Sequence, residues 1–385
     1  MAEMKTTEPQ GTPFVNEVRL NARQWAIALG ILLAVVLLTP PLWKKVERFE
    51  TGPDYRIPYT LSKDYWLYER RAAQFAGTNI IVLGDSVVWG EYVAPDGTLS
   101  HFLSRETGEP DRFVNAGVNG LFPLALEGLV NYYGSPLRGR KVLLHCNPLW
   151  MSSPKADLQT PKEEQFNHSR LVPQFSPRIP CYKADFNERF GAVVERNVPL
   201  VAWANHLQNA YFGQKSILNW TLADDGGEPP RYPNSYKNPF AQITLRVPSA
   251  PQNDPDRGPA SPRHKPWSNS SEGTTRFDWV SLDTSLQWAA FQRLVRLLRA
   301  RGVDVLVVVG PFNEHMMAEE NRPDFRRLRD GIAEWFTRNQ IPCIVPEPLP
   351  SSLYADASHP LTDGYQLLAQ RLYGDAAFRK WANGE

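Results

Sequence analysis

Short apolar runs alternate with segments of helical periodicity from residue 79 to near the C-terminus, and this alternation restricts the fold to the α/β class. The runs predict five strands, at 79–83, 112–118, 141–146, 303–309 and 341–345. Strands of this kind, separated by helices, form a mostly parallel sheet that is covered on both faces. We therefore expect one such sheet in the C-terminal part of the chain.

Helical spacing of apolar residues fills the intervals between these runs, at 98–106, 123–133, 285–301, 323–339 and 361–373. In sheets of this class, ligands bind outside the carboxyl ends of the strands. Polar residues and one glycine-containing turn follow five different predicted strands: Ser86, 117–120, Asn147, Asn313 and His359. We expect them to meet at one edge of the sheet.

An apolar segment near the N-terminus sets a second part of the chain apart. Trp25–Trp43 contains 19 residues without a charged or amide side chain. About 20 apolar residues span the hydrocarbon core of a bilayer, and tryptophan at both ends suits its interfaces. A cleaved signal peptide and a buried core helix are the alternatives. Against cleavage, 40–45 offers no small-x-small site, and against a core helix, the segment is apolar on every face. We predict a single-pass transmembrane helix at 25–43, after a polar tail at 1–24.

The charges that flank this segment do not fix its orientation. Basic residues precede it (Lys5, Arg19, Arg23) and follow it (Lys44, Lys45, Arg48, Arg56). The positive-inside rule alone slightly favours a cytoplasmic C-terminal domain, but a long domain can translocate regardless of these charges.

Composition excludes several classes of protein. The 385 residues suffice for one large α/β domain. A net charge of +1 gives no sign of the strongly basic balance that is typical of nucleic-acid-binding proteins. Three scattered cysteines form neither a disulfide framework nor a metal site, and no histidine or carboxylate spacing indicates a metal. We predict no metal and no cofactor.

The pattern divides the remainder into a membrane-proximal linker at 44–76 and a domain at 77–385 that carries an insertion at 148–284. Within the insertion, 186–209 has helical character. About ten prolines lie in 226–275, a composition that buries too little apolar surface to offset chain entropy. A flexible surface loop is therefore favoured there over a specific binding segment.

The chemistry is carried by Gly84-Asp85-Ser86, which closes the first strand and predicts a tight turn that lifts Ser86 to the edge of the sheet. A serine hydroxyl becomes a nucleophile when a neighbouring base takes its proton. His359 can act as that base, and Asp356, three residues earlier, can fix its tautomer. Gly-Asp-Ser alone would more often be a simple turn. With the buried strand before it and Asp-x-x-His near the C-terminus, it predicts a Ser86–His359–Asp356 triad.

Acyl transfer also requires donors aimed at the developing oxyanion. The candidates are the backbone N–H groups of Ser86 and Gly120 and the side-chain amide of Asn147. An asparagine that ends a strand can instead cap a turn, and Gly120 can instead serve a positive φ angle.

Several other residues fall near the predicted edge without a settled role. Asn313 and His315 are possible substrate-binding residues, although a surface histidine is favoured for His315. His145 lies two residues before Asn147, so a packed or hydrogen-bonded ring is favoured over a ligand. His168 lies in the insertion, and the sequence assigns it no role.

These motifs resemble those of the SGNH (GDSL-like) hydrolase superfamily over 79–147 and 284–375. Gly84-Asp85-Ser86 resembles the first signature block, with Ser86 as nucleophile. The segment 115–120 (NAGVNG) is similar to the second, with Gly120 as its last glycine, and Asn147 to the asparagine of the third. The segment 356–360 (DASHP) resembles the fifth. The resemblance implies a three-layer α/β/α fold and metal-independent acyl-ester chemistry.

The departures from this pattern are informative. The third block usually reads Gly-x-Asn-Asp, whereas 145–148 reads His-Cys-Asn-Pro, and the leucine that usually follows the serine is absent. With the apolar segment and the insertion, this is more similar to the membrane-linked branch, which includes alginate O-acetyltransferase-like and teichoic-acid D-alanylation-like proteins. The resemblance therefore implies a location at the inner (cytoplasmic) membrane, with the catalytic domain on the extracytoplasmic side.

The sequence thus predicts a membrane-anchored serine acyl-ester enzyme that transfers or hydrolyses O-acyl groups, with O-acetyl favoured. Its expected partners are an acylated cell-envelope polysaccharide or a small ester and, for transfer, a membrane-embedded protein that supplies acyl groups. Hydrolysis and transfer stay open. So does a different class, a non-catalytic scaffold of the same fold that binds polymer or partner proteins.

Overall fold

The structure is a computed structural model that describes residues 20–49, 51–52, 54–162, 167–222, 237–247, 265–270 and 273–384. It divides into two compact units, one up to Lys45 and one from Val46 to the C-terminus. Residues 1–19 of the predicted polar tail lie outside the described residues.

Helix α1 spans Ala22–Val46, and all of it except Val46 belongs to the first unit. It covers the predicted 25–43 and extends three residues further at each end. The helix is long and apolar enough to cross a membrane. Two prolines, Pro40 and Pro41, lie in its last two turns.

The second unit is built on one sheet of five parallel strands, which confirms the predicted α/β class. The strands are β1 Ile80–Leu83, β2 Phe113–Asn115, β3 Lys141–Cys146, β4 Asp304–Val309 and β5 Cys343–Ile344. Their order in the sheet is β2-β1-β3-β4-β5. Ile80 is in register with both Phe113 and Lys141, and Lys141 with Asp304. The second and fifth strands are shorter than predicted.

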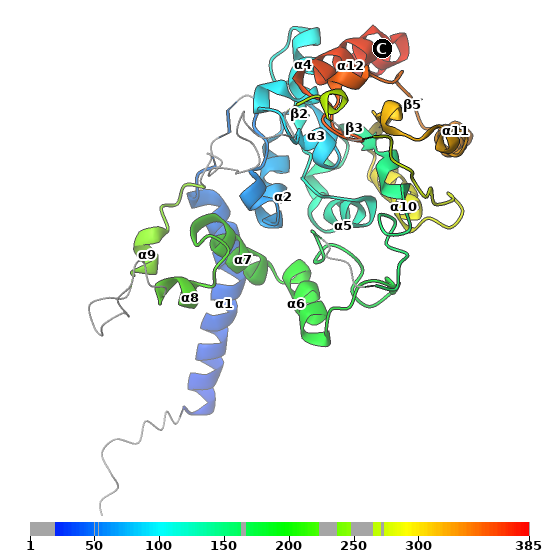
Figure 1. The fold of residues 1–385 in the computed structure, drawn as a ribbon. Helices are drawn as coiled ribbons and strands as arrows, with labels where there is room; N and C mark the ends of the chain where they lie inside the picture. Colours follow the sequence, from blue (N-terminus) through cyan, green and yellow to red (C-terminus); the bar gives the residue numbers. More distant parts are fainter. Residues whose placement is uncertain are drawn as a thin grey trace, which may run out of the picture. The chain divides into compact units, whose positions relative to one another are not determined.

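Helices cover both faces of the sheet. One face packs against α5 Pro123–Tyr133, α10 Leu286–Ala300 and α11 Arg322–Arg338. The other packs against α4 Leu99–Thr107, α12 Thr362–Gly374 and α13 Ala376–Asn383. Figure 1 shows α4 beside α12 above the sheet and α5 near α10. The three-layer α/β/α prediction is confirmed.

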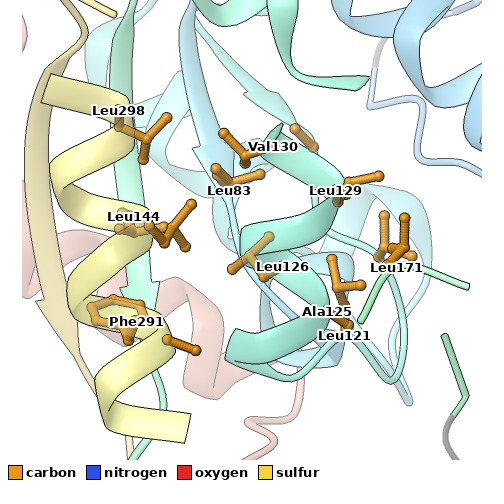
Figure 2. Close-up of a cluster of buried hydrophobic side chains, with 14 of the residues drawn as sticks. Leu83, Leu121, Ala125, Leu126, Leu129, Val130, Leu144, Leu171, Phe291 and Leu298 are labelled. Carbon is orange, nitrogen blue, oxygen red and sulfur yellow. The ribbon is translucent and has the colours of Figure 1, made fainter. Parts of the chain in front are cut away.

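Successive side chains of a strand pack alternately into the hydrophobic cores on the two faces of the sheet. Leu83 and Leu144 point toward α5 and α10, where Figure 2 shows them among Leu121, Ala125, Leu126, Leu129, Val130, Leu171, Phe291 and Leu298. Leu143 belongs to the core on the opposite face. Burying one such leucine contributes about 1.5–3 kcal/mol. This two-sided burial explains why the strands read as continuous apolar runs.

The predicted linker at 44–76 is wrong for its larger part, because residues from Val46 onward belong to the folded unit. Helix α2 spans Tyr65–Gln74, and the Asp64 side chain caps its N-terminus by accepting from the Leu67 N–H at 3.0 Å. Leu67 and Ala72 are buried in the main core. Aromatic and charged residues lie next to one another in this segment, as they do at a membrane interface. The helical pattern of α2 was therefore not evident from the sequence.

Within its described residues, the insertion supplies the α-helices α6 Phe186–Asn197, α7 Pro199–Tyr211, α8 Ile217–Thr221 and α9 Pro239–Gln242. The helical character predicted for 186–209 is confirmed, as two helices. Pro199 occupies the first position of the second helix, where its missing N–H costs nothing. Most of the predicted flexible loop at 226–275 lies outside the described residues.

The strand order places a topological switch between β1 and β3. The chain leaves β1 toward α4 on one face and leaves β3 toward α10 on the other. Loops that diverge in this way open a crevice at the carboxyl ends of the two strands. Ser86 follows β1 and Asn147 follows β3, so the two flank this crevice.

Candidate active site

Ser86, His359 and Asp356 form a continuous hydrogen-bonded chain, although 273 residues separate the first two. The Ser86 Oγ lies 2.8 Å from the His359 Nε2. The His359 Nδ1 lies 2.8 Å from both carboxylate oxygens of Asp356. Since a carboxylate only accepts, Nδ1 carries the hydrogen, and in the neutral ring Nε2 is left to accept the serine proton.

The nucleophile turn is built from β1 into a short helix, α3 Ser86–Trp89, which places Ser86 at the first helical position. Gly84 precedes it because an added Cβ would lie 2.6 Å from a methyl group of Val88 and 2.8 Å from the His145 Cβ. The Gly84 carbonyl accepts from the Val118 N–H at 3.2 Å, which ties the loop after β2 to this turn.

Segments distant in sequence brace α3. Tyr365 of α12 donates its hydroxyl to the Val87 carbonyl at 2.7 Å. Arg56 donates to the Trp89 carbonyl at 2.8 Å, and its guanidinium lies 4.2 Å from the Trp89 ring centroid. The predicted linker therefore supports the end of the helix that begins at Ser86, which the sequence did not indicate.

The loop after β5 holds Asp356 in place for His359. The Ser358 and His359 backbone N–H groups both donate to the Asp356 Oδ1 at 2.9 Å. Asn313 is fully buried, and its side-chain amide donates to the Asp356 carbonyl at 3.2 Å. Its backbone N–H donates to the Ala357 carbonyl at 2.8 Å. Asn313 thus holds this loop, and its role in binding a substrate stays a prediction.

Electrostatics favour a protonated His359 in the resting site. Burial disfavours the charged ring, but Asp356, aided by Glu91 and Asp85, outweighs it and raises the pKa of His359 to about 9. For Asp356, burial likewise disfavours the charged form, yet the attraction and hydrogen bond of His359 hold its pKa below the usual range. The neutral ring, the form that could act as a base, therefore predominates only above about pH 9.

Two residues beside the triad were not found from the sequence. The Glu91 carboxylate lies 3.5 Å from the His359 Nε2, on the side that faces Ser86. Tyr92 packs edge-on against the His359 ring, with centroids 5.2 Å apart, and adopts a φ of 69°. A bulky residue in the left-handed region is strained, a feature common at functional sites. The motif spacing gave no signal for either.

All three predicted oxyanion donors retain an N–H group that is available. Within the described part of the chain, the backbone N–H groups of Ser86 and Gly120 donate to no protein acceptor. Asn147 uses one N–H to donate to the Asp85 Oδ2 at 3.0 Å, which leaves a second. Its Oδ1 accepts from the Leu149 N–H, so it also caps the turn after β3. Their role as oxyanion donors stays a prediction.

Asp85 is the centre of a buried network that the sequence did not reveal. Its carboxylate accepts from the Val87 N–H and the Trp150 indole at 3.0 Å, in addition to the Asn147 amide. The His145 Nδ1 lies 3.1 Å from its Oδ1. Burial opposes ionisation of Asp85, but His145 and Asn147 hold its pKa below the usual range. The ionised Asp85 fixes the Asn147 amide plane, and His145 is a hydrogen-bonded histidine, as favoured from the sequence.

Gly120 lies under a segment of the insertion. Its φ is 73°, and an added Cβ would lie 2.3 Å from the Asn167 amide nitrogen. A glycine is required here both by conformation and by space. Gly120 also borders a cavity of about 300 Å³, whose walls include the apolar side chains of Phe122, Leu124 and Leu158.

His315 lies outside this arrangement. It is exposed, and its Nε2 lies 3.2 Å from the Leu349 carbonyl. Across the residues that the structure describes, no group of three or more His, Cys, Asp or Glu side chains is placed to share a metal ion.

The site therefore combines a serine hydroxyl that is hydrogen-bonded to a histidine with N–H groups that donate to no described protein acceptor, in loops that follow strands of a doubly wound sheet. Searches with family models and among curated proteins give no match for this chain. The chemistry of the site consequently has to be argued from its geometry.

Proposed function

We propose that this protein is a membrane-anchored serine acyl-ester enzyme of SGNH type. The observation that carries the proposal is the chain Asp356–His359–Ser86, with distances of 2.8 Å at both links. A general base within hydrogen-bond reach of a hydroxyl, itself oriented by a carboxylate, is the arrangement that activates a serine.

In the proposed first step, the Ser86 Oγ attacks the ester carbonyl carbon while the His359 Nε2 takes the hydroxyl proton. The carbonyl oxygen becomes an oxyanion and accepts from the Ser86 and Gly120 N–H groups and the Asn147 amide. The C–O bond to the leaving alcohol then breaks, and His359 returns its proton to that alcohol. Each oxyanion donor is expected to contribute about 3–4 kcal/mol to lowering the barrier.

In the second step, an acceptor hydroxyl attacks the acyl carbon while His359 takes its proton. The bond from the acyl carbon to the Ser86 Oγ then breaks, and His359 returns the proton to Oγ. The acceptor is water in a hydrolase and a sugar hydroxyl in a transferase, and the choice depends on how well water is excluded. A transferase would take its acyl groups from a membrane-embedded partner.

The substrate class rests on the family resemblance and on α1. We propose O-acyl groups, acetyl foremost, on a cell-envelope polysaccharide, with α1 as the anchor and the domain on the extracytoplasmic side. Support for the anchor is the length and apolarity of α1.

The test is turnover of activated acetyl esters by the full-length protein in detergent, compared with Ser86→Ala. The full-length protein is used because a fragment that began at residue 50 would lose the buried Glu47. We expect turnover by the unaltered protein and a loss of at least about a thousandfold in Ser86→Ala. Added glycans that capture the acetyl group would identify a transferase. Equal turnover by both proteins would refute the proposal and leave a non-catalytic scaffold.

A further inference from the structure

His168 connects the insertion to the loop that carries the predicted oxyanion donor Gly120. It is 2% exposed, and its Nε2 lies 2.8 Å from the Asn119 carbonyl oxygen. Its Nδ1 lies 3.1 Å from the Tyr65 hydroxyl, which comes from α2. The preceding residue, Asn167, is the one that would meet a Cβ on Gly120.

The neighbours of His168 fix its tautomer. The Asn119 carbonyl oxygen can only accept, so Nε2 must carry the hydrogen. In the neutral ring Nδ1 is then bare and accepts from the Tyr65 hydroxyl. Burial lowers the pKa of His168 to about 4, so the ring is neutral at ordinary pH. The result is a directed chain from Tyr65 through His168 to the Asn119 carbonyl.

This chain ends on the peptide unit that presents the Gly120 N–H. The Asn119 carbonyl and the Gly120 N–H belong to one planar peptide, in which a trans bond points them in opposite directions. Fixing the carbonyl therefore fixes the direction of the N–H. A hydrogen bond to the carbonyl also polarises the peptide and strengthens the N–H as a donor.

The loop that carries the Gly120 N–H is tied to the turn that carries Ser86. Two residues before Gly120, the Val118 N–H donates to Gly84, which lies two residues before Ser86. The φ of Gly120 is 73°, and a glycine has no side chain that would restrict its backbone to this conformation. An external hydrogen bond is what holds this peptide in one orientation.

We propose that His168 is a positioning residue that orients the Asn119–Gly120 peptide as part of the oxyanion hole. This inference rests on the proposed acyl-ester function. It gives the insertion a role in the site, because residues 167–168 hold the loop from one side while α2 holds His168 from the other.

Two substitutions at the same position test the proposal in the full-length protein. The amide nitrogen of glutamine reaches the place of an imidazole Nε2, whereas that of asparagine reaches only the place of Nδ1. With an activated acetyl ester, we expect His168→Asn to lower kcat about tenfold to a hundredfold, with KM changed little. His168→Gln should restore most of the loss. Tyr65→Phe, which removes the donor to Nδ1, should lower kcat only a few-fold.

A structural role alone would move thermal stability in both His168 variants without this split in kcat. The inference is overturned if His168→Asn turns over like the unaltered protein, or if His168→Gln is as impaired as His168→Asn. If His168→Asn does not fold, the other two variants decide. The inference then requires a near-normal kcat in His168→Gln and a kcat lowered only a few-fold in Tyr65→Phe. If the unaltered protein is as inert as Ser86→Ala, the proposed function fails and this inference with it. An active protein with unaffected His168 variants contradicts the inference alone.

Discussion

Two buried histidines in this protein have nearly the same electrostatics and different surroundings. In each, an aspartate binds Nδ1, with Asp356 at 2.8 Å from His359 and Asp64 at 2.7 Å from His206. Burial disfavours the charge in both, and the paired carboxylates outweigh it and raise the pKa of each ring to about 9. By charge alone the two sites cannot be told apart.

The second ring nitrogen separates them. The Nε2 of His359 faces the Ser86 hydroxyl, whereas the Nε2 of His206 lies 2.9 Å from the Glu47 carboxylate. Arg70 also pairs with Glu47, and the Tyr211 hydroxyl donates to it at 2.6 Å. Two cations, Arg70 and His206, balance two carboxylates, Glu47 and Asp64. These residues form a cluster, called the clasp below, that joins the start of the folded unit to α2 and α7.

An aspartate–histidine pair by itself therefore does not make a catalytic site. Both ring nitrogens of His206 are held by carboxylates, so neither is placed to take a proton from a serine hydroxyl. The reactive pair is the one whose Nε2 meets a hydroxyl at the crevice of the sheet.

Removing His359 should have the largest effect. We expect His359→Ala to lower kcat/KM for an activated ester by at least about a thousandfold, since the serine loses its base. His206→Ala, measured at a temperature where it stays folded, should keep most of its activity. A comparable loss of activity in both variants would erase the distinction between the two sites.

The order should reverse for stability. His206→Ala leaves Asp64 and Glu47 buried with one fewer cation, and breaking such a cluster costs about 3–5 kcal/mol in the free energy of unfolding. Denaturant unfolding in detergent would measure it. A loss below about 1 kcal/mol would show that the clasp contributes little.

The pH dependence of stability provides a sharper form of this test. The folded-state pKa of His206, about 9, lies above its usual value of 6.5. Its stabilising contribution is therefore fully present below pH 6.5 and is lost as the pH rises through about 9. We expect stability to fall over this window, and to fall less in His206→Ala. Equal declines would contradict the assignment.

Activity should change in the opposite direction over the same window. A protonated His359 cannot act as a base, so kcat/KM should rise about tenfold per pH unit on the acidic side and level off near pH 9. A pH–rate profile with a nonionising ester would record this. A plateau that begins near pH 6.5 would mean that the paired carboxylates do not raise the pKa of His359.

The smallest effect concerns Glu91. Its carboxylate contributes to the raised pKa of His359, so Glu91→Gln should move the acidic limb of the profile to lower pH and increase activity a few-fold at neutral pH. Glu47→Gln, at the corresponding place beside His206, should leave the limb unmoved. A limb that is unchanged in Glu91→Gln would exclude Glu91 from the site's electrostatics.

The sequence predicted those features that depend on local patterns. Strands buried on both faces are largely apolar, and Ser86 falls directly after one of them, whereas Asp356 and His359 lie in the loop between the last strand and the helix that follows it. Asp85, Glu91 and His168 were beyond its reach, because their roles depend on partners brought together only by folding. The contribution of Arg56 to the nucleophile turn was hidden for the same reason, and so was the packing of α2.

The most direct test of the central claim is covalent labelling of the full-length protein with a fluorophosphonate, followed by mapping of the labelled peptide. The account predicts a single adduct on Ser86 that is lost in His359→Ala and kept in folded His206→Ala. Labelling of a different serine, or an unlabelled but folded and unaltered protein, would contradict it.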